Sequence, residues 1–157
     1  MDIQSLKVDS GKVAEGTWVT GLPGAGDLRL RVRGWNSPKA VALRSRLERE
    51  APKSDRIRGG GMKPTASTRI GSQVLAEVVL LDWDGMTNGG EPMPYDADLA
   101  REWLMNPDFR QFADLVYTAA TWVDQGQAEA EEEIAGNLPQ SSGGASKTRA
   151  QKPVETS

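Results

Sequence analysis

The most restrictive feature of the sequence is a long amphipathic helix in its second half. Asn106 is a good N-cap, Pro107 suits the first helical position, and Asp108 carries the negative charge that the positive end of a helix dipole favours. Apolar residues then recur at steps of three or four, which places them on one face of a helix. That face consists of Phe109, Phe112, Val116, Ala119, Ala120 and Val123, widened by Leu115 and Trp122. We expect the helix to continue through residues 128–135, with Gly136 as its C-cap.

Three further helices are expected upstream. The first has a cap at Asn36 or Ser37 and Pro38 in its first turn, where a missing N–H is tolerated. A second covers residues 67–83; its β-branched content leaves a strand open, but its length and apolar spacing favour a helix. A short third helix starts at Asp96, which can serve as its N-cap. The expected buried sets are Ala40, Val41, Leu43 and Leu47, then Ile70, Val74, Leu75, Val78, Val79 and Leu81, and then Leu99, Trp103 and Leu104.

A β-hairpin is expected before these helices. Residues 16–22 form a short strand, residues 23–27 have the composition of a turn, and residues 28–35 alternate between apolar residues and arginines. The expected fold is mainly α (α+β), with a small N-terminal β-hairpin, about four helices and a disordered C-terminal tail. The expected organisation is a flexible N-terminus (1–15), the β-hairpin plus a helix (16–51), a flexible linker (52–66), a helical domain (67–136) and a disordered tail (137–157).

Composition excludes several classes of function. The chain has no Cys and no His, so disulfides, cysteine nucleophiles, histidine metal sites and Ser-His-Asp catalysis are absent. The start of the chain has no apolar run typical of a secretory signal, and the longest apolar stretch is too short to span a membrane. We therefore expect a soluble intracellular protein without a membrane partner.

Charge is divided unevenly along the chain. Residues 1–70 hold 14 Lys and Arg against 7 Asp and Glu, whereas residues 71–136 hold 2 against 14. Such polarity is typical of a binding protein, or of two halves that attract each other.

Three motifs resemble binding sites but fail in detail. The glycines of residues 21–26 have the spacing of a phosphate-binding loop, but the Lys and Ser/Thr that should follow are Asp27 and Leu28, so a hairpin turn is favoured. The spacing of the carboxylates Asp82, Asp84 and Glu91 does not fit a Ca²⁺-binding loop, although a Mg²⁺ site remains an alternative. We favour a turn whose carboxylates face solvent. The second strand and the first helix carry arginines that could neutralise phosphates, namely Arg29, Arg31, Arg33, Arg44, Arg46 and Arg49. Because the chain as a whole is acidic, we expect that it does not bind nucleic acid.

Aromatic residues are the strongest candidates for a binding surface. Five Trp is a high count for this length, and a small helical domain that exposes aromatic surface is suited to bind a partner. The alternative is that these side chains are buried in the protein's own core and form no binding surface. The partner-binding candidates are Trp83, Trp103, Phe109, Phe112, Val116, Trp122 and Val123.

The order of motifs after residue 79 resembles a known family. A Leu-rich Asp82-Trp83-Asp84-Gly85 segment leads to a glycine-containing turn at residues 88–91, and then to Pro94-Tyr95-Asp96 before a short helix. A long helix with an acidic end follows, and residues 30–36 followed by a helix are also similar. Over about residues 16–137 the chain resembles the tail assembly chaperones of long-tailed bacteriophages. Asp96 departs from the aromatic or small residue usual there, which leaves its capping role intact.

The resemblance implies a non-enzymatic protein that needs no cofactor. It would bind the tape measure protein, keep that long helical chain soluble and promote tail tube assembly; the major tail protein and a second copy of the chain remain open as further partners. It would act in the host cell cytoplasm and be absent from the mature virion. Such families often make a longer frameshifted form. Two alternatives remain: a structural virion component, such as a minor tail or connector protein, and a carboxylate-dependent enzyme that uses Mg²⁺.

Overall fold

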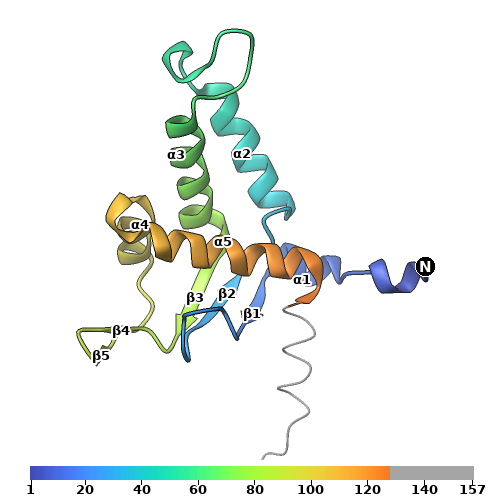
Figure 1. Ribbon diagram of the computed structural model, residues 1–157, viewed down its shortest axis with the longest axis vertical. Coiled ribbons are helices and arrows are strands. Elements are labelled where there is room, and N and C mark those ends of the chain that lie inside the picture. Colours follow the sequence, from blue (N-terminus) through green and yellow to red (C-terminus); the bar gives the residue numbers. More distant parts are fainter. Residues whose placement is uncertain (128–157) are drawn as a thin grey trace, which may run out of the picture.

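Five α-helices and a small antiparallel sheet make up the part of the chain that the computed structural model describes, residues 1–127 (Figure 1). The expected α+β class with a small N-terminal hairpin is therefore confirmed, while the predicted tail over residues 137–157 lies outside the described residues. The helices are α1 (Ser10–Glu15), α2 (Pro38–Glu50), α3 (Pro64–Val74), α4 (Ala97–Met105) and α5 (Arg110–Gln125); the strands are β1 (Thr17–Val19), β2 (Arg29–Val32), β3 (Leu80–Asp84), β4 (Thr87–Asn88) and β5 (Glu91–Pro92). Four shorter turns are η1 (Ile3–Leu6), η2 (Lys53–Asp55), η4 (Pro107–Phe109), all 3₁₀, and the π-helical η3 (Leu75–Val79).

The main sheet has three antiparallel strands in the order β1-β2-β3. The β1–β2 pair is the predicted hairpin, with Val19 opposite Leu30. The prediction of a helix over residues 67–83 is wrong in its last part, because Leu80–Asp84 is strand β3 and places Trp83 opposite Leu30. The third strand gives the hairpin a second neighbour, which an isolated two-stranded hairpin needs for stability.

The change from helix to strand occurs in η3, where the helix widens before it ends. The Arg33 backbone N–H donates to the Val79 carbonyl oxygen at 3.0 Å, and its guanidinium Nη1 donates to the carbonyl oxygen of Val78 at 2.9 Å. Arg33 Nε donates to the Ala14 carbonyl oxygen at 3.0 Å. Arg33 therefore satisfies the backbone groups freed at the end of a helix and ties three segments together. Local sequence periodicity does not contain this long-range pairing.

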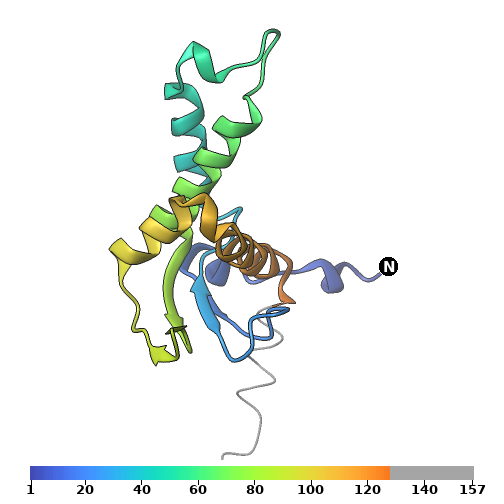
Figure 2. The same ribbon diagram turned by 60° about the vertical axis from the view of Figure 1, so that its left-hand side comes forward.

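Helix α5 lies across one face of the sheet (Figures 1 and 2). Its predicted start is confirmed, since the Asn106 side chain accepts a hydrogen bond from the Asp108 N–H and Pro107 opens η4. The helix ends at Gln125 because Gly126 adopts a left-handed φ of 78°, which favours glycine. The prediction that the helix continues unbroken to a cap at Gly136 is therefore wrong at Gly126, while residues 128–135 themselves lie outside the described residues. The buried face of α5 contains Ala113, Val116, Ala119, Ala120 and Val123.

Helices α2 and α3 form an antiparallel arm that stands away from the sheet (Figures 1 and 2). Ser37 caps α2 and Pro38 opens it, as predicted. Ala40 and Leu43 are buried against the core, but the predicted burial of Val41 is wrong, since 41% of its surface is exposed.

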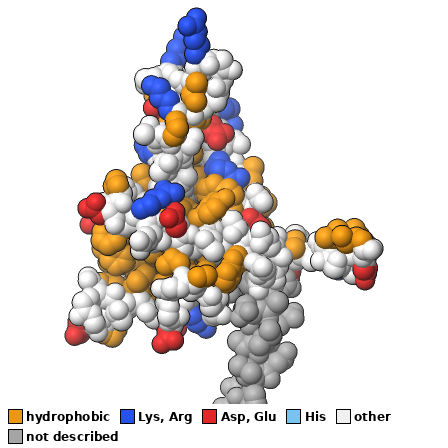
Figure 3. All heavy atoms as spheres, viewed as in Figure 1, with side chains coloured by type: hydrophobic (Ala, Val, Ile, Leu, Met, Phe, Trp, Pro, Cys, Tyr) orange, Lys and Arg blue, Asp and Glu red, His pale blue; other side chains and the backbone are white. Residues whose placement is uncertain are grey.

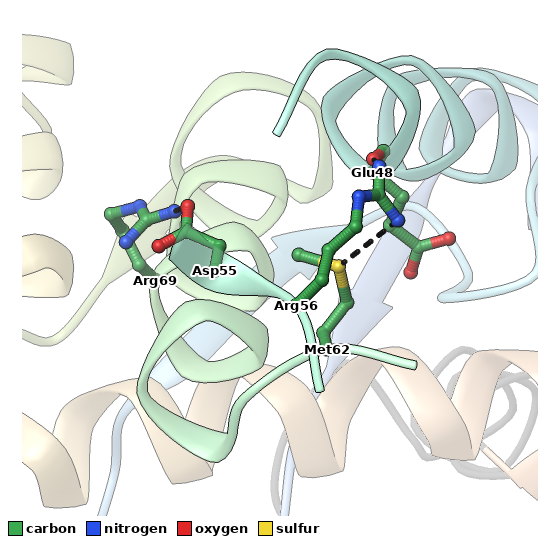
Figure 4. A network of polar contacts seen from close by, with 5 residues as sticks. All are labelled: Glu48, Asp55, Arg56, Met62 and Arg69. Atoms are coloured by element: carbon green, nitrogen blue, oxygen red, sulfur yellow. Dashed lines mark hydrogen bonds and ion pairs between the residues drawn. The ribbon is translucent and has the colours of Figure 1, made fainter. Parts of the chain in front are cut away.

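The loop at the tip of the arm covers part of the segment expected to be a flexible linker, residues 52–66. Arg56 reaches back to the Glu48 carbonyl oxygen and to the Met62 sulfur, and Asp55 forms an ion pair with Arg69 at 2.6 Å (Figure 4). These contacts fasten the loop to both helices that it joins. Similarly, residues 1–15, expected to be flexible, contain η1 and α1. The segment expected to be a helical domain, residues 67–136, contains the strands β3, β4 and β5.

Within residues 1–127, none of the helices combines the length and apolar content that crossing a bilayer requires.

The end of α5 is fastened to the segment that precedes α2. Both carboxylate oxygens of Asp124 accept from the Asn36 N–H, at 3.1 and 3.2 Å. Burial raises the pKa of the Asp124 carboxyl above its ordinary value of 3.8, despite the opposing hydrogen bonds from Asn36 and Trp35 and the charge of Arg44. The folded protein therefore holds this proton more tightly than the unfolded chain does.

The raised pKa of Asp124 predicts a pH effect on stability. A folded protein that binds this proton more tightly than the unfolded chain loses stability as the pH rises through the interval just above 3.8. Asp124→Asn removes this titration. The unfolding free energy of wild type, measured relative to that of the variant, should therefore fall as the pH rises across that interval. Urea unfolding at several pH values between about 3.5 and 6 measures the difference, a range set by the ordinary carboxyl pKa. A difference that does not vary with pH would contradict the expectation.

Candidate partner-binding surface

Five aromatic rings meet where α4 turns into α5, and we call them the aromatic cluster: Trp83, Tyr95, Trp103, Phe109 and Phe112. Trp103 is at the centre, stacked on Trp83 and on Phe109 with ring centroids 5.6 Å apart in each case. Phe112 meets Trp83 and Trp103 edge-on, at 6.1 and 5.9 Å. These are the offset-stacked and T-shaped geometries that aromatic pairs prefer.

Helix caps create the corner at which these rings meet. The Asp96 carboxylate accepts from the Leu99 N–H at 3.0 Å and starts α4, as predicted. The chain turns at Asn106, the single residue between α4 and η4, and its side chain caps the next helical segment. Because the turn is so short, Trp103 before it and Phe109 after it are brought face to face.

Trp83 anchors the cluster in the core. Only 4% of its surface is exposed, and its indole Nε1 donates to the Met93 carbonyl oxygen at 2.7 Å. Tyr95 contacts it edge-on at 5.0 Å. Burial raises the pKa of the Tyr95 hydroxyl above 10.0, helped by the negative charges of Asp82 and Asp96, so this ring stays neutral at physiological pH. The inner side of the cluster is thus a fixed, uncharged support.

The outer side of the cluster is open to solvent. Phe109 exposes 42% of its surface, and Trp103 and Phe112 are partly exposed. Exposed acidic residues lie on the same two helices, including Asp98, Glu102 and Asp114. Figure 3 shows hydrophobic side chains gathered on the body around α4 and α5, and Lys and Arg side chains on the arm. The arrangement is an apolar surface within an acidic body.

An ion pair links the base of the arm to α4. Arg101 donates to a Glu77 carboxylate oxygen at 3.0 Å. Burial raises the pKa of Glu77, but the hydrogen bonds from Arg101 and Gln73 outweigh it and leave the pKa below 4.5. Glu77 therefore stays charged at neutral pH, which keeps this link between η3 and α4 intact.

The predicted partner-binding residues separate into three groups. Trp83, Trp103, Phe109 and Phe112 come together in the cluster, although Trp83 faces inward. Val116 and Val123 are in the core beneath α5, with 0% and 4% of their surfaces exposed, so a partner cannot reach them in this fold. Trp122 is half-buried against the core and belongs to no ring pair of the cluster.

Two tyrosines are absent from the predicted set. Tyr95, in the Pro94-Tyr95-Asp96 motif, joins the aromatic cluster, and Tyr117 is 44% exposed and meets Trp35 edge-on at 5.1 Å. The Arg44 guanidinium lies 4.2 Å from the centre of the Trp35 ring. Trp35 and Tyr117 can be recognised in the sequence as large aromatic residues. Their pairing cannot, because it depends on how α5 crosses the sheet.

The other candidate sites have simpler roles in the structure. Asp82 accepts from the Trp83 N–H, and Asp84 pairs with Arg29 at 3.7 Å. Glu91 is exposed in β5, and residues 1–127 contain no group of three or more carboxylates that could hold a metal ion. The glycines of residues 21–26 lie in the connection between β1 and β2. Arg29 also lies over Trp18, 4.6 Å from the ring centre, so this arginine is engaged within the protein.

The fold and the cluster define a small α+β protein that presents a preformed aromatic surface. A family model described as YdaY prophage protein matches residues 35–137, about two thirds of the chain. The chain belongs to this YdaY prophage protein family and is therefore a phage-derived protein. No curated protein and no solved structure matches the chain. The matched range contains the whole arm, the aromatic cluster and α5.

Proposed function

We propose that this phage-derived protein is a tail assembly chaperone that binds the tape measure protein, keeps it soluble and promotes tail tube assembly. The observation that carries the proposal is the open side of the aromatic cluster, formed by Phe109, Trp103 and Phe112. The rings are held in place by stacking and by the buried Trp83. Aromatic side chains that are already fixed bind a partner with little further loss of conformational freedom.

The acidic surface around the cluster supports the same role. A protein that covers apolar segments of a client must itself remain soluble, and a high density of like charge opposes self-aggregation. Residues 75–127 hold 10 Asp and Glu against 2 Lys and Arg. The proposed action makes and breaks no covalent bond and needs no cofactor. It takes place in the host cytoplasm, and the protein does not remain in the mature virion.

The Phe109→Ser variant should bind the tape measure protein at least tenfold more weakly than wild type, because truncation of an aromatic anchor removes 2 kcal/mol or more of binding energy in an interface hot spot, an order-of-magnitude value. The matched control is Ile57→Ser at the tip of the arm, since Ile57 is similarly exposed at 49% but lies far from the cluster in sequence and fold. The chain is co-expressed with the tape measure protein of the same prophage, and the soluble complex is quantified by size-exclusion chromatography.

Failure of the wild-type chain to retain or solubilise the tape measure protein would remove the proposal. Mass spectrometry of purified particles provides a second test. Stoichiometric amounts of the chain in mature virions would favour the alternative of a minor tail or connector protein.

A further inference from the structure

Two adjoining pockets form one groove between α3 and α5, and none of the residues that line it belongs to the aromatic cluster. The pockets have volumes of about 320 and 240 Å³. They share four lining residues and so are continuous: Thr68, Ser72, Arg110 and Ala113. The groove begins at Pro107 and ends at Trp35 and Tyr117. Along α5 it extends from Arg110 to Tyr117, which corresponds to roughly 10 Å at 1.5 Å per residue.

The charge of the groove is opposite to that of its surroundings. Arg69 on α3 and Arg110 on α5 line it from both walls, whereas no Asp or Glu is among its lining residues. This contrasts with the acidic body, in which α4 and α5 carry exposed carboxylates such as Asp98 and Asp114. Both arginines are about half exposed. Arg110 pairs with the exposed Asp114, and such an ion pair is weak in water, so Arg110 is available to a carboxylate brought by a partner. Arg69 pairs with Asp55, whose side chain is only 20% exposed, and adds a fixed positive charge to the opposite wall of the groove.

The shape of the groove indicates a helical occupant. Its floor contains the buried residues Ser72, Leu75, Leu104 and Ala113, while Thr68 and Gly71 form a low wall. Both walls are helices whose backbone hydrogen bonds are internal, so the groove offers no strand edge to an extended peptide. Small side chains allow a helix to approach closely, and its contacts are then made by side chains at i, i+3, i+4 and i+7.

We infer that the groove between α3 and α5 binds an amphipathic helix of the partner, with an apolar seam on the floor and flanking Asp or Glu side chains against Arg69 and Arg110. The inference rests on the proposed function and assigns the client a second contact besides the aromatic cluster. The proposal is specific for a helix that carries negative charge beside its apolar side chains.

Gly71 provides the sharpest test, because its backbone is helical and an added Cβ meets no heavy atom within 4 Å. Gly71→Leu therefore projects a side chain into the groove from a position with room for its Cβ, and it replaces a poor helix former by a good one. The expected result is an unchanged or higher Tm and at least tenfold weaker retention of the co-expressed tape measure protein. Ser45→Leu on the exposed side of α2 is the control and should retain wild-type binding.

Charge is tested separately with a matched pair of arginines. Arg110→Gln should weaken the complex three- to tenfold and flatten its dependence on salt, because exposed charge pairs are screened. Arg46→Gln is the control, since Arg46 also forms an exposed i,i+4 ion pair, with Glu50, but does not line the groove. Equal effects of the two substitutions would overturn the assigned charge of the occupant.

The outcomes separate the groove from the function. If wild type and Gly71→Leu retain the tape measure protein equally while Phe109→Ser does not, the groove inference is wrong and the proposed function stands. If wild type does not retain the tape measure protein, both the groove inference and the proposed function are wrong.

Two other occupants of the groove are tested with the purified chain alone. If the molecular mass in solution doubles as the protein concentration rises, and if the Gly71→Leu variant stays monomeric, the groove binds a second copy of the chain. Altered amide NMR shifts at Thr68 and Tyr117 when Glu129, Glu131, Glu132 and Glu133 are replaced by Gln would assign it to the chain's own acidic segment.

Discussion

The Trp83→Ala variant is expected to be the most destabilised single substitution in the cluster, with a loss of about 3–5 kcal/mol in unfolding free energy. Trp83 is almost fully buried, stacks on Trp103, donates to the Met93 carbonyl oxygen and is paired across the sheet with Leu30. Its removal leaves a cavity and an unsatisfied carbonyl group. Thermal unfolding followed by circular dichroism should show a Tm lower by roughly 10 °C or more.

The control for this prediction is Trp83→Phe. Phenylalanine retains most of the apolar volume and the stacking but cannot donate to Met93, so about 1–3 kcal/mol should be lost for the unpaired buried carbonyl and the smaller ring. Equal stability of wild type and Trp83→Ala would show that the cluster is not part of the core, and would also remove the support for a fixed binding surface.

The second large effect is expected at Gly34, for which alanine should lower the unfolding free energy by about 1–3 kcal/mol, the range for an overpacked interior. A Cβ at this position would clash with Asp124 Oδ1 and would lie 2.7 Å from Val13 Cγ1. The carboxylate cannot move away freely, because it accepts hydrogen bonds from the Asn36 N–H. Relief of the clash therefore breaks the link between the end of α5 and the start of α2.

A double-mutant cycle tests this explanation. In the Asp124→Ala background, Gly34→Ala should be less destabilising than in wild type, because the closest atom is gone while the contact with Val13 remains. Urea unfolding of the four proteins gives the coupling energy. Additive effects would mean that the clash with Asp124 does not determine the penalty.

Elements whose signals are local could be predicted from the sequence. The caps at Ser37, Asp96 and Asn106 each satisfy N–H groups within three residues, so the starts of three helical segments are encoded in short stretches. The β1–β2 hairpin is similar, since its strands are close in sequence and its alternation is regular. Strand β3 could not be predicted in the same way, because its apolar spacing also fits a helix and its partner β2 lies some fifty residues upstream.

The candidate binding residues were predictable as a set but not by their roles. Periodicity identified the apolar face of α5, but Phe109 at its start is exposed while Val116 and Val123 are buried, because only part of the helix lies over the sheet. The stacking of Trp103 on Phe109 depends on the one-residue turn at Asn106. The groove beside α3 has no local signature, since its two walls come from distant segments.

The position of β3 after the arm has a consequence for how the polypeptide reaches its native state. Strands β2 and β3 can pair only when the intervening chain, which contains both helices of the arm, has closed on itself. A helical hairpin that forms early shortens this loop and lowers the entropy lost on closure. Substitutions that stabilise α2 or α3 should therefore accelerate refolding, whereas changes in α5, which covers the finished sheet, should act mainly on the unfolding rate.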